Sequence, residues 1–256
     1  MPRYRWIEPT PLDHAGYELA DNLLLSEILA RRGLGDPGAV AAYLAPSLDT
    51  LIDPLSLPDL ALARDLTLRA VERGERIAIF GDYDVDGLTS TALLVRLLRA
   101  LGADVVPYIP HRIDDGYGLK LDAVRCIITE GASLLITVDN GTSSAAELAE
   151  ARRAGLDTIV LDHHAVDSAG DYSWASAFVS PMRPDARLAF RGFAAVGVAY
   201  QLARAVAGDR AAARLLPLVA LGTVADIVPL ISDNRTLVAP GLERFDADAP
   251  IGLRAL

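Results

Sequence analysis

Apolar residues in the first part of the chain recur about every three to four positions, the spacing of helices, and do not alternate as they would in strands. This pattern predicts helices over residues 23–32, 37–44 and 60–73. The first and the third are each followed by a glycine, which is favoured just past a helix C-terminus. Residues 46–58 are rich in turn formers. We therefore interpret residues 1–75 as a helical N-terminal cap that leads into the main domain.

From residue 76 onward the pattern changes to short apolar runs, each closed by small or acidic residues. These runs predict buried strands over residues 77–80, 105–109, 134–138 and 158–161. Helical periodicity follows the first three runs, over residues 89–101, 119–130 and 144–154, each with a glycine just past its end. Alternating strands and helices predict an α/β fold with a doubly wound, mainly parallel sheet. Ligands of such sheets bind at the carboxyl ends of the strands.

The chain after residue 164 is less regular. Residues 165–191 show no clear periodicity, and helices are predicted over residues 193–207, 210–221 and 235–245. The sequence stops at Leu256 without a pattern that would close a further domain. We therefore expect one domain over residues 76–256 that is cut off from a longer protein.

Acidic residues and histidines gather where the predicted strands end. The segments are GDYDVDG (residues 81–87), TVDNG (137–141), LDHH (161–164) and TVAD (223–226). The first three directly follow strands, so the sheet would present them in one crevice. Asp82, Asp84 and Asp86 alternate, so that in an extended segment their carboxylates would share one side. We place the start of the following helix at Thr89 and Ser90.

So many carboxylates in one crevice would repel one another strongly unless a cation lay among them. Few lysines or arginines are nearby in the sequence, whereas aspartates with adjacent histidines are a ligand set suited to Mn²⁺ and acceptable for Mg²⁺ or Zn²⁺. Two ions about 3.5–4 Å apart, bridged by a carboxylate, would generate a hydroxide nucleophile and clamp a phosphoryl oxygen. The pattern therefore favours metal-assisted hydrolysis.

Each segment has a simpler interpretation when taken alone. DxDxDG also occurs in calcium loops, but the glutamate that such a loop needs six residues after the glycine is Leu93 here. TVDNG alone is typical of an ordinary strand-to-turn junction, and adjacent histidines occur on surfaces. The joint occurrence of the segments at successive strand ends is what favours a site.

Composition limits the class of protein. The chain has 52% hydrophobic and 23% charged residues, which is enough apolar material for a buried core. The net charge of -10 argues against a basic nucleic-acid surface, although bound cations would offset several of the clustered acids. The single cysteine, Cys126, is expected in the core and cannot form an internal disulfide. Without a signal-like or membrane-spanning segment, we expect a cytoplasmic protein with no membrane association.

The ordered set GDYDVDG, HRIDDGYGL, ITVDNG, VLDHH and ALGTVADIVPL resembles the motif series of the DHH phosphoesterases, and specifically of the RecJ-like exonucleases. The resemblance extends from about residue 25 to the end. It implies that Asp84, Asp86, Asp139, His163 and Asp226 are metal ligands, with Asp139 as the bridge. Many members carry a histidine ligand where this chain has Phe80, and Asp82 is expected to replace it.

The resemblance also implies roles next to the metals. His164 would contact the scissile phosphate, and Asp162 would orient a histidine. The residues His111, Arg112, Gly116, Tyr117 and Ser90 are expected to contact substrate. A simple hairpin or helix-entry turn is the alternative for the segment that contains His111 and Tyr117.

The function that the resemblance implies is 5′-to-3′ hydrolysis of single-stranded DNA to mononucleotides in DNA repair and recombination, with two Mn²⁺ ions, or Mg²⁺, as cofactors. Expected partners are single-stranded DNA and, through the family, a single-strand-binding protein and a helicase. The family's DHHA1 and OB-fold domains are not present in this sequence. Two alternatives stay open: a phosphodiesterase for short oligonucleotides or cyclic dinucleotides, and a non-catalytic subunit of a replication complex.

Overall fold

The computed structural model describes residues 7, 10, 22–167 and 170–255. The chain divides into two compact units, Met1–Ser47 and Leu48–Leu256. The first unit contains α1 (Leu23–Arg31) and α2 (Pro37–Leu44), which agree with the predicted helices to within a residue. Side chains cap both helices: Asn22 accepts hydrogen bonds from the first turn of α1, and Asp36 does so for α2.

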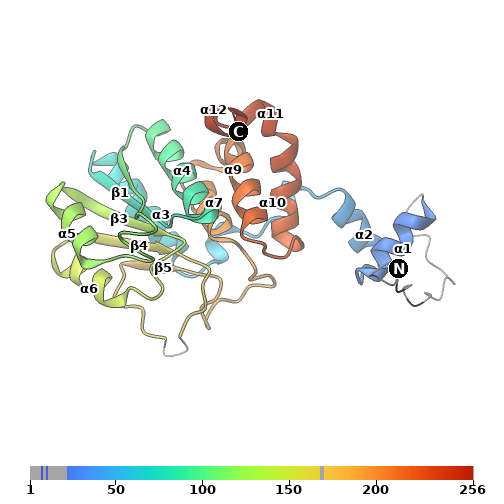
Figure 1. The fold of residues 1–256 in the computed structure, drawn as a ribbon, viewed down its shortest axis with the longest axis horizontal. Helices are drawn as coiled ribbons and strands as arrows, with labels where there is room; N and C mark the ends of the chain where they lie inside the picture. The colour runs from blue at the N-terminus through green and yellow to red at the C-terminus, as the bar shows by residue number, and fades with distance from the viewer. Residues whose placement is uncertain (1–6, 8–9, 11–21, 168–169, 256) are drawn as a thin grey trace, which may run out of the picture. The chain divides into compact units, whose positions relative to one another are not determined.

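The second unit is built on a sheet of five parallel strands (Figure 1). In spatial order they are β2 (Asp104–Tyr108), β1 (Arg76–Gly81), β3 (Ala132–Val138), β4 (Asp157–Leu161) and β5 (Ala177–Val179). β2 lies on one side of β1, and β3 lies on its other side, so the strand order reverses between β1 and β3. The α/β fold with a doubly wound parallel sheet is confirmed.

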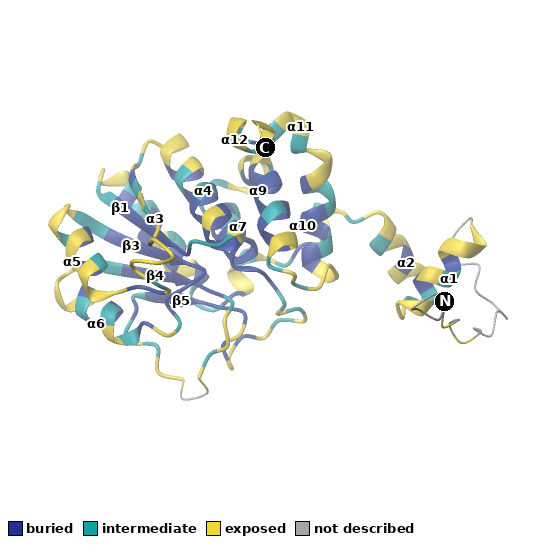
Figure 2. Cartoon of the chain, viewed as in Figure 1, coloured by how far each residue is buried: buried dark blue, intermediate teal, exposed yellow. Residues whose placement is uncertain are grey.

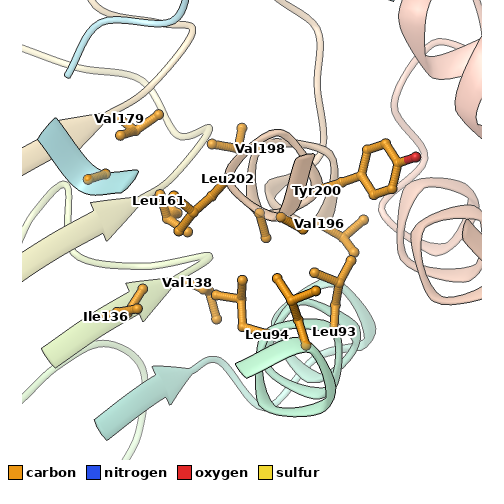
Figure 3. Packing of buried hydrophobic residues seen from close by; sticks show 14 of the residues in the cluster. Leu93, Leu94, Ile136, Val138, Leu161, Val179, Val196, Val198, Tyr200 and Leu202 are labelled. Carbon is orange, nitrogen blue, oxygen red and sulfur yellow. The ribbon is translucent and has the colours of Figure 1, made fainter. Parts of the chain in front are cut away.

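Helices cover both faces of the sheet, so that its strands are buried while the outer sides of the helices are exposed (Figure 2). Residues of α3 (Leu60–Glu72), α4 (Val85–Ala100) and α7 (Ala195–Ala207) share one core cluster with β1, β3 and β4. In Figure 3, Val138 and Leu161 point from the strands toward Leu94 and Leu202 of these helices. On the opposite face, α5 (Leu121–Thr129) and α6 (Ala145–Arg153) form a smaller cluster.

The remaining elements complete the second unit. They are the 3₁₀ turns η1 (Leu48–Thr50), η2 (Pro54–Ser56) and η3 (Ala213–Leu215), and the helices α8 (Asp209–Ala212), α9 (Leu216–Ala225), α10 (Ser232–Glu243), α11 (Phe245–Asp248) and α12 (Ile251–Ala255). α9 packs against both α4 and α10. α3, which the sequence analysis assigned to the N-terminal cap, belongs to this unit and packs against α7 and β5.

The structure corrects three local predictions. β5 lies inside residues 165–191, which seemed irregular because a strand of three residues is too short to show periodicity. The helix predicted over residues 210–221 is broken into α8, η3 and α9, with Pro217 in the first turn of α9. Cys126 is exposed on α5 and is not a core residue.

None of the helices that the structure describes combines the length and apolar character that crossing a bilayer requires.

Candidate metal centre

The acidic segments singled out in the sequence meet at the carboxyl end of the sheet. Asp82 directly follows β1, Asp139 follows β3, and Asp162 and His163 follow β4. Asp226 comes from the C-terminal end of α9, which packs against α4. Because β1 and β3 are neighbours where the strand order reverses, their carboxyl ends open into the crevice in which ligands of such sheets bind.

Side chains at this end of the sheet form groups whose potential ligand atoms all lie within 4.8 Å of one another. The groups are Asp82, Asp84 and Asp139; Asp86, His163 and Asp226; and Asp139, His163 and His164. Asp139 and His163 each belong to two groups, so the three groups make one continuous cluster. The fold thus brings together every side chain that the sequence analysis named as a metal ligand.

The first acidic segment is folded differently from the prediction. α4 begins at Val85 and not near Thr89, because Asp84 is its N-cap and accepts a hydrogen bond of 3.0 Å from the backbone N–H of Gly87. Asp86 therefore lies in the first turn of the helix. The prediction of three aspartates alternating along an extended segment was wrong, since a capping carboxylate starts the helix four residues earlier.

Helix α7 holds Asp86 in place. The Asp86 carboxylate accepts hydrogen bonds from the backbone N–H groups of Ala195 (2.6 Å) and Val196 (2.8 Å), at the N-terminus of α7. Burial raises the pKa of Asp86 to about 6, although these two donors act to lower it. The next residue, Gly87, lets the first turn of α4 lie against the end of β1, because a Cβ there would be 2.5 Å from the backbone nitrogen of Asp82.

Asp139 sits at the sharp end of β3. Its backbone is left-handed, with φ of 58°, and its N–H donates to the carbonyl of Leu161 at the end of β4 (3.1 Å). This turn directs the Asp139 carboxylate into the crevice, where it is only 2% exposed. Burial, reinforced by the nearby Asp86 and Asp84, raises its pKa to about 8. A cation in the crevice would favour the ionised form of this carboxyl.

His163 lies at the middle of the cluster. Its Nε2 is 3.3 Å from Asp139 Oδ1 and 3.9 Å from Asp86 Oδ2, and its Nδ1 is 3.7 Å from Asp226 Oδ2. Burial by itself would lower the pKa of His163, but the three carboxylates raise it to about 9. The proton that this imidazole holds would therefore compete with a metal ion for the site, because a histidine must be neutral to bind a metal.

Asp162 contacts His164 and the backbone around it. Its Oδ1 lies 2.7 Å from His164 Nδ1, and its two oxygens accept hydrogen bonds from the backbone N–H groups of His163 (2.8 Å) and Thr142 (3.0 Å). Burial alone would raise the pKa of Asp162, but these hydrogen bonds lower it below its ordinary value. The anchored imidazole is 46% exposed, so it borders the open side of the crevice.

The donor set fits divalent cations. Asp82 Oδ1 and Asp226 Oδ2 are buried and have no hydrogen-bond partner among the residues that the structure describes. Burial raises the pKa of both carboxyls. A buried carboxylate oxygen without a hydrogen bond is costly, and carboxylate oxygens with imidazole nitrogens are the ligands that Mn²⁺ and related ions take. Asp82, Asp84 and Asp139 could hold one ion, and Asp86, His163 and Asp226 a second, with Asp139 Oδ1 3.3 Å from His163 of the second group.

The loop after β2 reaches the same crevice. The Arg112 guanidinium lies 4.3 Å from the centre of the Tyr83 ring. Tyr83 stands between Asp82 and Asp84 in the sequence. The Tyr117 hydroxyl donates to the carbonyl of Asp139 (3.4 Å), and its ring meets His164 edge-on. Gly116 and Gly118 supply the left-handed backbone on either side of Tyr117, and His111 is an exposed residue whose ring pairs with Asp114.

Ser90, which was expected to contact substrate, is not accessible from the crevice. It is fully buried in α4, because the helix starts at Val85 and Ser90 then falls on its inner face. Two contributors escaped the sequence analysis. Tyr83 stacks against Arg112, and the backbone of Thr142 anchors Asp162. The position of Tyr83 within GDYDVDG could have suggested a role. Thr142 acts through its backbone N–H, which every residue except proline has, so its residue type could not have suggested one.

Residues 76–223 match the family model described as the DHH family, N-terminal domain. Among characterised proteins, the single-stranded-DNA-specific exonuclease RecJ of Bacillus subtilis is 37% identical over 233 residues, which are 91% of this chain and 29% of that protein. The chain spans between 29% and 44% of the length of the RecJ proteins it matches.

Solved structures agree with this match. A crystal structure of exonuclease RecJ bound to manganese is similar with a TM-score of 0.72 at 40% identity, over 80% of this chain and 52% of that one. RecJ of Thermus thermophilus in complex with Mn²⁺ has a TM-score of 0.73 at 36% identity, over 90% of this chain and 32% of that one. The same enzyme in complex with Mg²⁺ has a TM-score of 0.62 at 33% identity, over 90% of this chain and 29% of that one.

The matched region, 76–223, is more than half of the 256 residues and contains β1 to β4, α7 and most of the clustered ligands. On this match, and on the arrangement of aspartates and histidines at the ends of its strands, the chain belongs to the DHH family.

Proposed function

We propose that this chain is the catalytic core of a metal-dependent exonuclease that degrades single-stranded DNA from the 5′ end to mononucleotides, in DNA repair and recombination. The observation that carries the proposal is the cluster in which Asp139 is shared between two groups of potential metal ligands. The names of the similar proteins, single-stranded-DNA-specific exonuclease RecJ, support the substrate class. The direction of degradation comes from the resemblance of the motifs to the RecJ series.

The proposed cofactors are two divalent ions, Mn²⁺ or Mg²⁺. Solved structures of RecJ contain one or the other, and the oxygen-rich ligand set here suits both. Bound ions of this kind acidify a water molecule and offset charge on a phosphoryl oxygen. Asp82 would take the place of the histidine ligand that other family members carry, which accounts for its buried, unpartnered oxygen.

The protein's own groups would position the substrate. Asp162 engages His164 through Nδ1, which leaves Nε2 of His164 free to hold an oxygen of the scissile phosphate. Arg112 places a positive charge beside the segment that contains Asp82 and Asp84, and its contact with the Tyr83 ring keeps it there. Tyr117, 43% exposed and in contact with His164, would pack against the terminal nucleotide.

The test uses a single strand labelled at one end, with MnCl₂, and the Asp139→Asn variant. We expect the protein to release labelled mononucleotide from the 5′ end and the variant to lose at least about a hundredfold in rate, since one carboxylate serves both proposed ions. Asp122→Asn, an exposed aspartate of α5, is the matched control and should retain activity.

Three outcomes would reject the proposal: full activity of Asp139→Asn, a ladder that shortens from the 3′ end, or faster turnover of dinucleotides than of long strands. The last would favour the oligonucleotide phosphodiesterase that the sequence analysis left open.

We also propose that the catalytic domain starts near residue 76, where the family match begins, and that the reaction takes place in the cytoplasm. A single-strand-binding protein and a helicase are the proposed partners, by resemblance to the family. Co-purification of the full-length protein with each of them would test this.

A further inference from the structure

A buried asparagine joins the loop that leads into α7 to the loop that follows α9. Asn234 lies in the first turn of α10 and is fully buried. Its side-chain Nδ2 donates to the backbone carbonyl of Gly192, before α7 (2.6 Å), and to that of Pro229, after α9 (3.0 Å). One side chain thus connects two loops that are far apart in the sequence.

Each of these loops helps to place a carboxylate of the metal centre. Gly192 stands three residues before Ala195, whose N–H donates to Asp86 at 2.6 Å. Pro229 stands three residues after Asp226. Asp86 and Asp226 belong to the same group of potential metal ligands. The buried amide therefore connects the two supports that set how far apart these two carboxylates lie.

The loop after α9 needs such a support because its backbone is strained. Ile227 and Ser232 lie at its two ends with φ of 61° and 48°, which β-branched and other ordinary side chains rarely adopt. Strained backbone persists only where surrounding contacts fix it, and the hydrogen bond from Asn234 to Pro229 lies between these two residues. We expect the loop to relax without this bond and to move Asp226, which directly precedes Ile227.

Both contacts require an amide at this position. A carbonyl oxygen only accepts hydrogen bonds, so the atom that contacts both carbonyls is the amide nitrogen with its two N–H groups. The Oδ1 of Asn234 is buried and has no hydrogen-bond partner in the part of the chain that the structure describes, which is costly. Leucine has nearly the same shape and would avoid this cost. The two donors are therefore what asparagine adds here.

We propose that Asn234 is a positioning residue for the metal centre. It holds the loops before α7 and after α9 together, and it thereby keeps Asp226 at ligand distance from Asp86. It acts through the backbone of the two loops. The inference rests on the proposed function, because it concerns the ion that Asp86, His163 and Asp226 would hold.

The first test is titration of the 256-residue chain with MnCl₂ in a calorimeter. Asn234→Leu keeps the shape and removes both donors, so we expect it to weaken Mn²⁺ binding at least tenfold. Asn234→Ser is a second variant, whose short side chain cannot reach both carbonyls, and it should weaken binding at least fivefold. Thermal unfolding shows that each variant is folded.

Gln201→Met is the matched control. Gln201 is also a fully buried amide, and its Oε1 accepts a hydrogen bond from Arg204 (2.8 Å) in the same helix, α7. Its replacement also removes a buried polar contact and should lower stability. We expect Mn²⁺ affinity to change less than twofold.

A double-mutant cycle separates positioning from general loosening of the fold. Asp226→Asn alone should weaken Mn²⁺ binding at least tenfold. Because Asn234 acts through Asp226, adding Asn234→Leu to Asp226→Asn should weaken binding by less than a further twofold. Combined with Asp82→Asn, which lies in another group of potential ligands, Asn234→Leu should keep at least a fivefold effect.

The inference alone is overturned if the unchanged chain binds Mn²⁺ and both Asn234 variants bind it as tightly. It is also overturned if Gln201→Met loses as much affinity, or if Asn234→Leu has its full effect in the Asp226→Asn background, since loss of stability would then explain the result. If the unchanged chain binds no Mn²⁺, the proposed function fails and this inference fails with it.

Discussion

At the residue scale, left-handed backbone conformations lie on both sides of the metal centre. Asp139 has φ of 58° and Ile227, directly after Asp226, has φ of 61°. For Asp139 the conformation turns the carboxylate into the crevice. Ile227 has a β-branched side chain, which disfavours the left-handed region by roughly 1–2 kcal/mol. This side chain is 88% exposed, so packing offsets little of that cost.

Ile227→Asn should therefore stabilise the metal-free protein. Asparagine tolerates the left-handed region, so we expect the free energy of unfolding to rise by about 0.5–1 kcal/mol. Urea unfolding followed by circular dichroism measures this. Ile251→Asn is the matched control, since Ile251 is 79% exposed in α12 and does not have positive φ. An equal effect of both substitutions would show that Ile227 stores no strain.

At the element scale, the metal centre depends on how closely α9 approaches α4. Gly222 of α9 faces this contact: a Cβ there would lie 2.2 Å from Thr89 Oγ1, 2.9 Å from Val196 Cγ1 and 3.2 Å from Asp86 Oδ1. α9 also carries Asp226 just past its end. The distance between the two helices therefore sets the distance between two of the clustered carboxylates.

Gly222→Ala should push α9 away from α4. We expect the free energy of unfolding to fall by about 1–3 kcal/mol, as in other overpacked cores, and Mn²⁺ binding, measured by calorimetry, to weaken at least fivefold. Gly252→Ala in α12, with no atom within 4 Å of the added methyl, should not lower the free energy of unfolding, since alanine favours a helix, and should leave Mn²⁺ binding unchanged. Unaltered metal affinity in Gly222→Ala would mean that the cluster does not depend on this contact.

Arg183 joins the residue before α3 to the edge strand β5 and to Asp185 in the loop after that strand. Its guanidinium donates to Asp59 before α3 (2.6 Å), to the carbonyl of Phe178 in β5 (2.7 Å) and to Asp185 (2.7 Å). The Arg183 side chain is 9% exposed, whereas those of Asp59 and Asp185 are 35% and 58% exposed. Water therefore weakens part of these ion pairs.

Arg183→Met should lower the free energy of unfolding by about 2 kcal/mol, because the buried carbonyl of Phe178 loses a donor while the exposed carboxylates regain water. Chemical denaturation measures the loss. Arg125→Met removes an ion pair with Asp122 that is exposed on both sides, and no measurable change is expected from it. If the two variants were equally stable, β5 and α3 would not depend on this arginine.

The same scale shows where prediction from sequence succeeded. Hydrophobic periodicity is a property of residues close together in the sequence. It predicted the positions of strands β1 to β4 and of helices α1, α2 and α3 to within a few residues. The start of α4 was missed because Asp84 had been interpreted as a metal ligand only, and it also caps the helix. β5 was missed because its existence depends on pairing with β4 and not on its own pattern.

At the scale of the whole molecule, the cluster of carboxylates makes stability depend on divalent ions. Ions that bind only the folded state stabilise it by about 2.7 kcal/mol when their concentration is a hundred times the Kd. We expect MnCl₂, added after treatment with EDTA, to raise the unfolding temperature by several degrees. Asp139→Asn should lose most of the increase, since Asp139 belongs to two of the ligand groups.

Scanning calorimetry with and without MnCl₂ measures this effect, and NaCl at equal ionic strength controls for general screening of the net charge of -10. An equal rise with NaCl would attribute the stabilisation to screening and not to the metal centre.

The sequence alone determined the fold class and indicated which residues gather in the cluster. The fold class follows from hydrophobic periodicity, which specifies strands and helices, and the cluster was indicated by acidic segments that each follow a strand or a helix and by the resemblance of their motifs to a family. The tertiary structure alone decided which atoms meet. The hydrogen bonds from Ala195 and Val196 to Asp86, the stacking of Arg112 on Tyr83, and the burial of Ser90 join residues through packing between elements. Sequence spacing does not encode these contacts, because they depend on the distances and orientations at which the packed helices and strands come to rest.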